Sequence, residues 1–208
     1  IMNKKNNLGL DICFMDEDDP FVVFKQWMSD AEKNEINDPN AVALATVNES
    51  HQPDVRMVLL KEFNSNGFIF FTNLNSKKGT DLKTIPKASM CFHWKSLLRQ
   101  VRITGDISLI SDKEADEYFN SRPYISRIGA WSSNQSKPME TRDSFLNKVE
   151  EYKNKYSDQN KVPRPNHWSG FLLSPQRIEF WKDVEGRLHQ RLEYLKEINS
   201  WRKRILYP

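Results

Sequence analysis

Basic side chains recur inside otherwise apolar, strand-like segments of this 208-residue chain. Arg56 and Lys61 flank the apolar residues of RMVLLK, and Arg99, Gln100 and Arg102 lie in RQVRI. Burying a charge in an apolar strand is costly unless an oppositely charged or polar group lies against it. Both segments are therefore candidates for contact with an anionic heterocycle, although solvated strand ends would produce the same pattern.

Two further groups of side chains could bind an anion such as phosphate. Lys77 and Lys78 open a predicted short helix, whose free backbone amides would add to their positive charge. Gln135 and Ser136 form a weaker polar pair in the loop GAWSSNQSK. The ordinary interpretation of the two lysines is a solvated surface pair.

The segment YFNSRPYIS places an arginine and two hydroxyl groups around the end of a predicted helix. Tyr118 and Arg122 lie four residues apart, and Ser126 follows in the predicted loop. Such a group can surround a phosphate dianion. An arginine that only neutralises the last carbonyls of the helix is an equally good local interpretation.

The densest group lies in IEFWKDVEGRLHQR, near the carboxyl end of the chain. Trp181 offers a flat surface, while Arg187, His189 and Arg191 alternate, so that on a strand all three would share one face. Three basic side chains on one face repel each other unless an anion is near. The four histidines lack metal-ligand spacing, and no metal site is expected.

The elements that must position these residues can be read from periodicity and turn signals. Pro20 should open an amphipathic helix, SDKE at Ser111 has the pattern of a capping box, and a second polar helix is expected over 142–156. Strands are predicted in AVALATV, DVRMVLLKEF, GFIFFTN, ASMCFHW and RQVRITGDISLI, with the helix KKGTDLKTI before Pro86, and two final strands over 170–182 and 187–194 around a turn at DVEG.

This order predicts a mainly β fold with added helices: an antiparallel meander of about five strands within a closed or nearly closed barrel. Residues 1–19 are polar and are predicted to be a mobile arm, and residues 20–208 a single domain. No apolar run approaches the ~18 residues that span a bilayer, and only two cysteines are present, so a cytoplasmic location without a membrane is expected.

The formal charge of +3 suits a protein that handles small anions, and it also suits a weak nucleic-acid binder. No dinucleotide fingerprint, P-loop or nucleophile elbow occurs, so side chains must hold any phosphate and hydrolase chemistry has no support.

Six motifs occur in the order found in pyridoxine/pyridoxamine 5′-phosphate oxidases: RMVLLK, FFTNLNSKK, RQVRITG, YFNSRP, IGAWSSNQS and IEFWKDVEGRLHQR. The chain resembles this family from about Asp19 to Pro208. The resemblance implies an FMN-binding split β-barrel that is active as a homodimer, with its flavin sites between subunits and without nucleic acid as a partner.

The resemblance also implies a role for each matching residue. FMN would be held by Arg56, Met57, Val58, Leu59, Leu60, Lys61, Phe71, Thr72, Lys77, Lys78, Gln100, Gln135, Ser136, Trp181 and Arg191. The substrate would meet Lys61, Tyr118, Arg122, Ser126, Arg187, Leu188 and His189, of which Arg187 and His189 would act on the reacting carbon.

The implied reaction oxidises pyridoxamine or pyridoxine 5′-phosphate to pyridoxal 5′-phosphate by hydride transfer to the flavin, and dioxygen then restores the flavin with release of hydrogen peroxide. Two positions and one segment depart from the family pattern. Lys77 and Ile205 stand where arginine is common, and NKKNNLGL lacks the arginine and tyrosine of an active-site lid. Such a lid is absent here or uses Lys4 and Lys5.

Two alternatives remain open from the sequence. Another split-barrel flavoprotein could use the same FMN platform on a different substrate, with only YFNSRP and RLH arguing against it. Basic strands with interleaved aromatic residues are also typical of a non-catalytic flavin-binding or nucleic-acid-binding barrel.

Overall fold

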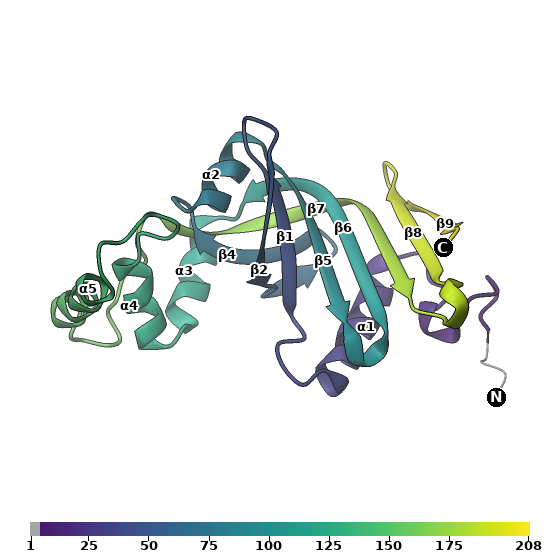
Figure 1. Ribbon diagram of the computed structural model, residues 1–208, viewed down its shortest axis with the longest axis horizontal. Helices are drawn as coiled ribbons and strands as arrows, with labels where there is room; N and C mark the ends of the chain where they lie inside the picture. Colours follow the sequence, from purple (N-terminus) through teal and green to yellow (C-terminus); the bar gives the residue numbers. More distant parts are fainter. Residues whose placement is uncertain (1–4) are drawn as a thin grey trace.

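The computed structural model describes residues 5–208, and within them nine strands form one antiparallel sheet that curls into a half-barrel (Figure 1). The strands are β1 (Ala41–Val47), β2 (Pro53–Leu59), β3 (Glu62–Asn64), β4 (Gly67–Asn73), β5 (Lys87–Trp94), β6 (Arg99–Leu109), β7 (Trp168–Lys182), β8 (Gln190–Lys196) and β9 (Trp201–Leu206). Their order is β2-β1-β5-β6-β7-β4-β3, and β8 and β9 extend the sheet from β7. The predicted fold class is confirmed.

The longest strand, β7, organises the sheet because it has different neighbours at its two ends. It pairs with β6 along most of its length, with β4 over Trp168–Leu173 and with β8 over Arg177–Lys182. The register between β6 and β7 shifts between Thr104 and Gly105, where β7 has one extra residue, Gln176, and this β-bulge bends the sheet between these two halves. One strand therefore connects two distant parts of the molecule.

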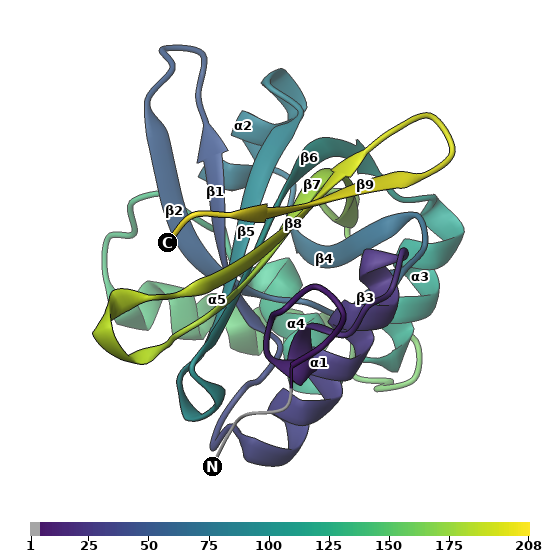
Figure 2. The same cartoon turned by 90° about the vertical axis from the view of Figure 1, so that its right-hand side faces the viewer.

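Helix α1 (Pro20–Asn34) fills the open side of the half-barrel, as its apolar spacing predicts (Figure 2). Asp19 caps it by accepting the Phe21 N–H at 2.9 Å, and Pro20 stands at the first turn. The ring of Phe24 is fully buried against the rings of Phe68 and Phe92. Burial of this one side chain contributes roughly 2–3 kcal/mol to folding.

The other helices are α2 (Lys77–Thr84), α3 (Asp112–Ser121), α4 (Tyr124–Ser132) and α5 (Arg142–Lys155), with short 3-10 turns η1 (Ile12–Phe14), η2 (Lys95–Leu97) and η3 (Glu185–Arg187). Helices α3, α4 and α5 form a lobe at the end of β7 opposite to β8 (Figure 1). This lobe has its own small core, which includes Phe119, Ile128 and Trp168. The predicted capping box at Ser111 and Glu114 is present at the start of α3.

The structure differs from the predicted arm over residues 10–19. The ring of Phe14 is fully buried in the main core, Asp11 forms an ion pair with Lys182 at 2.5 Å, and the Tyr194 hydroxyl donates to the Glu17 carbonyl. These residues therefore pack as part of the domain, because apolar side chains within the polar segment find places in the core. Lys5 is exposed, whereas Lys4 lies outside the described residues.

Three further expectations need correction. The strands do not form a simple meander, because β5 pairs with β1 and β4 pairs with β7. Helix α4 and strand β9 were not predicted. The last strand pair begins at Gln190 and not at Arg187, which moves two predicted site residues off the strand.

In residues 5–208, none of the helices combines the length and the apolar character that crossing a membrane requires. The cytoplasmic location stays a prediction.

Candidate functional site

A cavity of about 650 Å³ opens between the sheet and the helical lobe. This volume lies in the range of roughly 300–1,000 Å³ that is usual for small-molecule sites. Strands β2 and β4, helices α2, α3 and α4, and the first residue of β7 contribute to its wall. Eleven of the predicted site residues line it: Met57, Val58, Leu59, Lys61, Phe71, Thr72, Lys78, Tyr118, Arg122, Ser126 and Gln135.

Lys78 supplies a buried positive charge to this cavity. Its ammonium group lies 3.2 Å from the Gln135 side-chain oxygen and 3.4 Å from the Thr72 hydroxyl, and in residues 5–208 no carboxylate forms an ion pair with it. Burial and, to a smaller extent, the charge of Arg56 lower its pKa. A cation that is desolvated and held only by neutral groups is ready to bind an anion.

Arg56 and Lys77, by contrast, are paired with carboxylates. Arg56 lies 2.7 Å from Asp54 and donates to the Thr46 hydroxyl, while Lys77 lies 3.4 Å from Asp54 and 3.2 Å from Asp81. These contacts fix the two cations beside the cavity but outside its lining. An anion bound here would compete with Asp54 and Asp81 for these two cations.

Arg122 and Tyr118 form the other end of the cavity. The guanidinium carbon of Arg122 lies 4.7 Å from the ring centre of Trp168. The ring of Tyr118 stacks on that of Phe71, with 3.9 Å between the ring centres. One terminal nitrogen of Arg122 is buried and has no hydrogen-bond partner among the described residues. Burial lowers the pKa of this guanidinium group. A guanidinium group in a cavity wall that also contains Ser126 suits an incoming oxyanion.

A second cluster lies at the other end of β7. The strand registers place Gln100, Trp181 and Arg191 in one row across β6, β7 and β8, so their side chains share a face. Glu179, which is almost completely buried, holds Arg191 at 2.9 Å and Arg102 at 3.3 Å. Because one carboxylate compensates two guanidinium groups, this face keeps a net positive charge.

The loop after β7 adds Arg187, Leu188 and His189 to the second cluster. The prediction that Arg187, His189 and Arg191 alternate on one strand is wrong. Arg187 lies in η3 with φ 62°, next to Gly186 with φ 73°, so the chain turns through the left-handed region before β8 begins. The His189 ring lies 4.7 Å from that of Trp181.

Asp183 orients the His189 ring, because its carboxylate lies 2.8 Å from Nδ1. The backbone N–H of Val184 also lies 3.3 Å from Nδ1, so the contacts within the described residues hold this nitrogen, and Nε2 is the one left for a ligand. Arg187 is exposed, and none of the ion pairs within residues 5–208 includes it.

The two clusters are far apart within one chain. Trp168 of the cavity begins β7 and Trp181 lies near its end, and a strand of 15 residues spans roughly 45 Å at the usual rise per residue. Figure 1 shows the helical lobe and β8 at opposite ends of the molecule. A ligand of ordinary size cannot touch both clusters of the same chain.

Two predicted residues lie away from both clusters. The side chain of Leu60 is buried in the main core, and its N–H donates to the Asn40 carbonyl. Ser136 lies in the loop after Gln135 with φ 70° and lines a neighbouring hollow.

Sequence reasoning missed several residues of the cavity wall, above all Trp168 and Asn73. They are paired across β4 and β7. The signal for Trp168 was an aromatic residue that follows two prolines and opens a strand.

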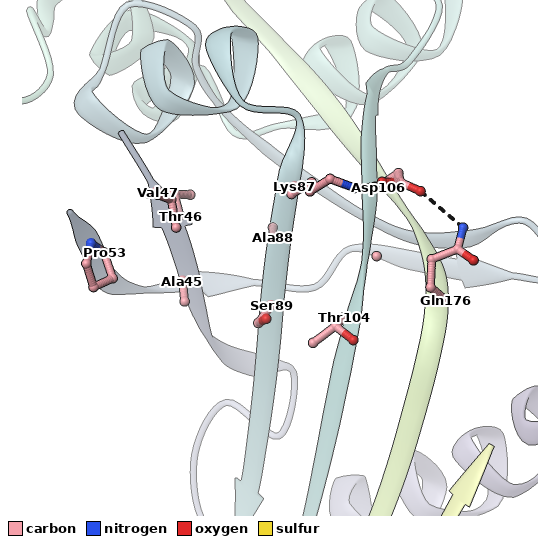
Figure 3. A pocket seen from close by; sticks show the side chains of 11 residues that line it. Ala45, Thr46, Val47, Pro53, Lys87, Ala88, Ser89, Thr104, Asp106 and Gln176 are labelled. Carbon is pink, nitrogen blue, oxygen red and sulfur yellow. Dashed lines mark hydrogen bonds and ion pairs between the residues drawn. The ribbon is translucent and has the colours of Figure 1, made fainter. Parts of the chain in front are cut away.

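A second hollow, of about 340 Å³, lies on the sheet surface formed by β1, β5 and β6 (Figure 3). Small side chains such as Ala45 and Ser89 line most of it. Its charged side chains are already paired: Lys87 lies 2.8 Å from Asp106, which also accepts a hydrogen bond from Gln176. It offers no free charge to a ligand.

Residues 5–208 bring together no group of three or more His, Cys, Asp or Glu side chains that could hold a metal ion. This site offers a ligand buried positive charge and flat aromatic surfaces.

Comparison with family models matches both parts of the chain. Residues 28–156 match the model described as pyridoxamine 5′-phosphate oxidase, and residues 168–208 match the pyridoxine 5′-phosphate oxidase C-terminal dimerisation region. The first match contains all the cavity residues except Trp168, and the second contains Trp168, Trp181, Arg187, His189 and Arg191.

Similar proteins carry related names. The chain is 59% identical to a pyridoxine/pyridoxamine 5′-phosphate oxidase of Pelagibacter ubique over the full length of both, and 53% identical to that of Allorhizobium ampelinum, with 94% of this chain and 95% of the relative covered. A crystal structure of PhzG from Burkholderia lata, in complex with tetrahydrophenazine-1-carboxylic acid, has a TM-score of 0.89 at 25% identity, with 99% and 100% of the two chains covered. An FMN-binding protein of Nostoc punctiforme shares the fold, with a TM-score of 0.73 at 17% identity over 91% of this chain and 98% of the other.

Proposed function

Because the chain belongs to the pyridoxine/pyridoxamine 5′-phosphate oxidase family, we propose that it oxidises pyridoxamine or pyridoxine 5′-phosphate to pyridoxal 5′-phosphate. FMN is the proposed cofactor, dioxygen the electron acceptor and hydrogen peroxide the second product. The observation that carries this proposal is the cavity, in which Lys78 and Arg122 lie beside stacked aromatic rings and, within residues 5–208, form no ion pair with a carboxylate.

The residues of the cavity fit a flavin phosphate. Lys78 is a buried cation held by neutral groups, and Gln135 and Thr72 lie within hydrogen-bond distance of it. Arg56 adds a second charge nearby, fixed by Asp54. Bound FMN would supply a two-electron acceptor, which no side chain of the protein can replace.

The proposed substrate site uses the other end of the same cavity. Arg122 would bind the phosphate with its free donors, and the Tyr118 and Ser126 hydroxyls would add hydrogen bonds. Lys61, on the cavity wall after β2, would approach both substrate and cofactor. By holding the substrate through its phosphate, these four side chains would give the reacting carbon one orientation.

The second cluster would complete the site from a partner subunit. The dimerisation region spans residues 168–208, which include the loop with Arg187 and His189. Because β7 separates this loop from the cavity of its own chain, we assign the loop to the cavity of the other chain in a homodimer. Each dimer would then hold two equivalent sites, related by its twofold axis.

Arg187 and His189 would act at the reacting carbon. The exposed guanidinium of Arg187 can position the substrate through charge-assisted hydrogen bonds to its polar ring substituents, and the His189 ring can bind its amine or hydroxyl. Trp181 and Gln100 would lie against the flavin ring, where Gln100 presents an amide to a polar ring edge.

A rival function is oxidation of another heterocycle on the same platform, since the Burkholderia protein was solved with a phenazine derivative. The degree of identity argues against it, because the relatives named as B6 oxidases are 59% and 53% identical and PhzG is 25% identical.

The purified protein tests the proposal directly. We expect a yellow preparation with flavin absorption bands, and aerobic formation of pyridoxal 5′-phosphate and peroxide from pyridoxamine 5′-phosphate. A yellow protein that leaves both phosphorylated vitamers unchanged would support the rival. A colourless protein that binds oligonucleotides in a salt-dependent manner would support a nucleic-acid-binding barrel.

Replacing Lys78 with methionine should weaken FMN retention by about 10- to 100-fold, the usual effect of a lost hydrogen bond to a charged group. The dissociation constant can be measured by fluorescence of released flavin. Lys83→Met, on the same helix but exposed, is the matched control and should leave retention unchanged.

The Lys78 contribution should also depend on pH. Because its pKa is lowered, the ammonium loses its proton at a lower pH than an ordinary lysine. FMN affinity should fall as the pH rises through that pKa, and the difference between the native protein and Lys78→Met should then close. A difference that stays constant into alkaline solution would contradict this role.

A further inference from the structure

Trp168 links the cavity to the helical lobe. Its ring is almost completely buried and lies nearly parallel to the rings of Phe71, at 5.2 Å and 12°, and of Tyr118, at 6.1 Å and 6°. The backbone N–H of Trp168 donates to the Pro165 carbonyl, and the backbone carbonyl of Trp168 accepts a hydrogen bond from the Arg164 guanidinium. The ring is therefore fixed by its neighbours and by its own backbone.

Arg164 extends this anchoring to helix α3. Its guanidinium binds Asp112 at 2.7 Å and Asp116 at 2.5 Å, both on the first turns of α3. The same helix carries Tyr118 and ends just before Arg122. The position of the Trp168 ring is consequently tied to the helix that presents the proposed phosphate-binding residues.

Among the described residues, the guanidinium of Arg122 is held by aromatic faces and not by carboxylates. It lies 4.7 Å from the ring centre of Trp168 and 5.7 Å from that of Phe119. An aromatic face attracts a cation without using its N–H donors or cancelling its charge. Arg56 and Arg191, by contrast, are oriented by Asp54 and Glu179.

We propose that Trp168 is a positioning residue: its ring holds the Arg122 guanidinium flat and leaves the donors of Arg122 free for the substrate phosphate. This inference rests on the proposed function. A carboxylate in place of the ring would compete with the dianion for the same donors, so an aromatic support suits a phosphate site.

Packing alone would be the simpler role for Trp168, since it also contacts Phe119 edge-on at 5.1 Å in the core of the lobe. The two roles predict different dependence on the substrate. Loss of packing would impair oxidation of any substrate, whereas loss of the support for Arg122 would impair only ligands that carry a phosphate.

The test compares Trp168→Leu and Trp168→Phe with the native holoenzyme. For Trp168→Leu we expect KM for pyridoxamine 5′-phosphate to rise about tenfold, in line with a partly desolvated cation–π contact, with little change in kcat. Binding of inorganic phosphate, measured by calorimetry, should weaken by the same factor. Trp168→Phe should restore most of the loss, and kcat/KM for unphosphorylated pyridoxamine should not change.

Trp131→Phe is the matched control. Trp131 belongs to the same small core and carries the Lys155 ammonium at 5.9 Å, but it does not contact Arg122. We expect its KM values to be unchanged. An equal loss with both substrates, an unchanged KM in Trp168→Leu, or the same KM increase in Trp131→Phe would overturn the inference. If the native protein oxidises neither substrate, the proposed function fails, while the phosphate titration still decides whether Trp168 supports anion binding.

Discussion

Replacing Arg187 with alanine should reduce turnover on the order of 100- to 1,000-fold while FMN stays bound. Preorganised charge at a reacting centre usually contributes an effect of this size. Arg187 is exposed, and a left-handed turn at the tip of the loop fixes its backbone. None of its contacts in the described part of the chain is an ion pair, so its charge is available to a ligand. Steady-state kinetics and the flavin spectrum of the same preparation measure both quantities.

Arg202→Ala is the control for the loss of a positive charge in the dimerisation region. Arg202 lies on β9 with its side chain mostly exposed and pairs with Glu197, so turnover should remain close to that of the native protein. If Arg187→Ala loses as much flavin as is expected for Lys78→Met, the proposed division between cofactor-binding and substrate-binding residues is wrong.

Replacing Arg122 with alanine should raise KM for pyridoxamine 5′-phosphate by about 100-fold or more. Truncation of one partner of a buried, charge-assisted pair usually costs a few kcal/mol, and one nitrogen of this side chain has no hydrogen-bond partner in residues 5–208. The ratio of kcat/KM for phosphorylated and unphosphorylated pyridoxamine is the measurement, and it should collapse in Arg122→Ala.

Arg142→Ala serves as the control, because Arg142 is exposed at the start of α5, outside the cavity. Its ratio should equal that of the native protein. An unchanged ratio in Arg122→Ala would remove this arginine from the phosphate site, and with it the proposed role of Trp168.

Local signals in the sequence predicted the elements that carry them. Pro20 after Asp19 and the capping box at Ser111 are made by neighbouring residues, so they could be read without the fold. Helix α4 has no such signal: Pro123 precedes it without a side-chain cap, and burial of Ile128 against the lobe stabilises it. Its helical state depends on tertiary packing that the local sequence does not record.

The residue types of the site could be predicted, but their arrangement could not. The motifs identified Lys78, Arg122 and Arg187 as site residues. No local pattern shows that β7 separates Lys78 and Arg122 from Arg187. A positive φ at Arg187 is rare for its residue type, so alternation along a strand was the natural prediction there. The pairing of β7 with β8 ends at Lys182 and Gln190, and it places Arg187 in the loop between these two strands.

Subunit complementation tests most directly the claim that each site is built by two chains. Arg122→Ala removes the phosphate-binding arginine of the cavity and Arg187→Ala removes the arginine of the loop. With substrate near the native KM, and so far below the KM of Arg122→Ala, we predict that each homodimer has little activity. Equal amounts of the two variants, refolded together, should give mixed dimers in half of the molecules, each with one intact site, and so about a quarter of the native activity. Activity no higher than the mean of the two homodimers, with mixed dimers demonstrated by mass spectrometry, would contradict a site shared between subunits.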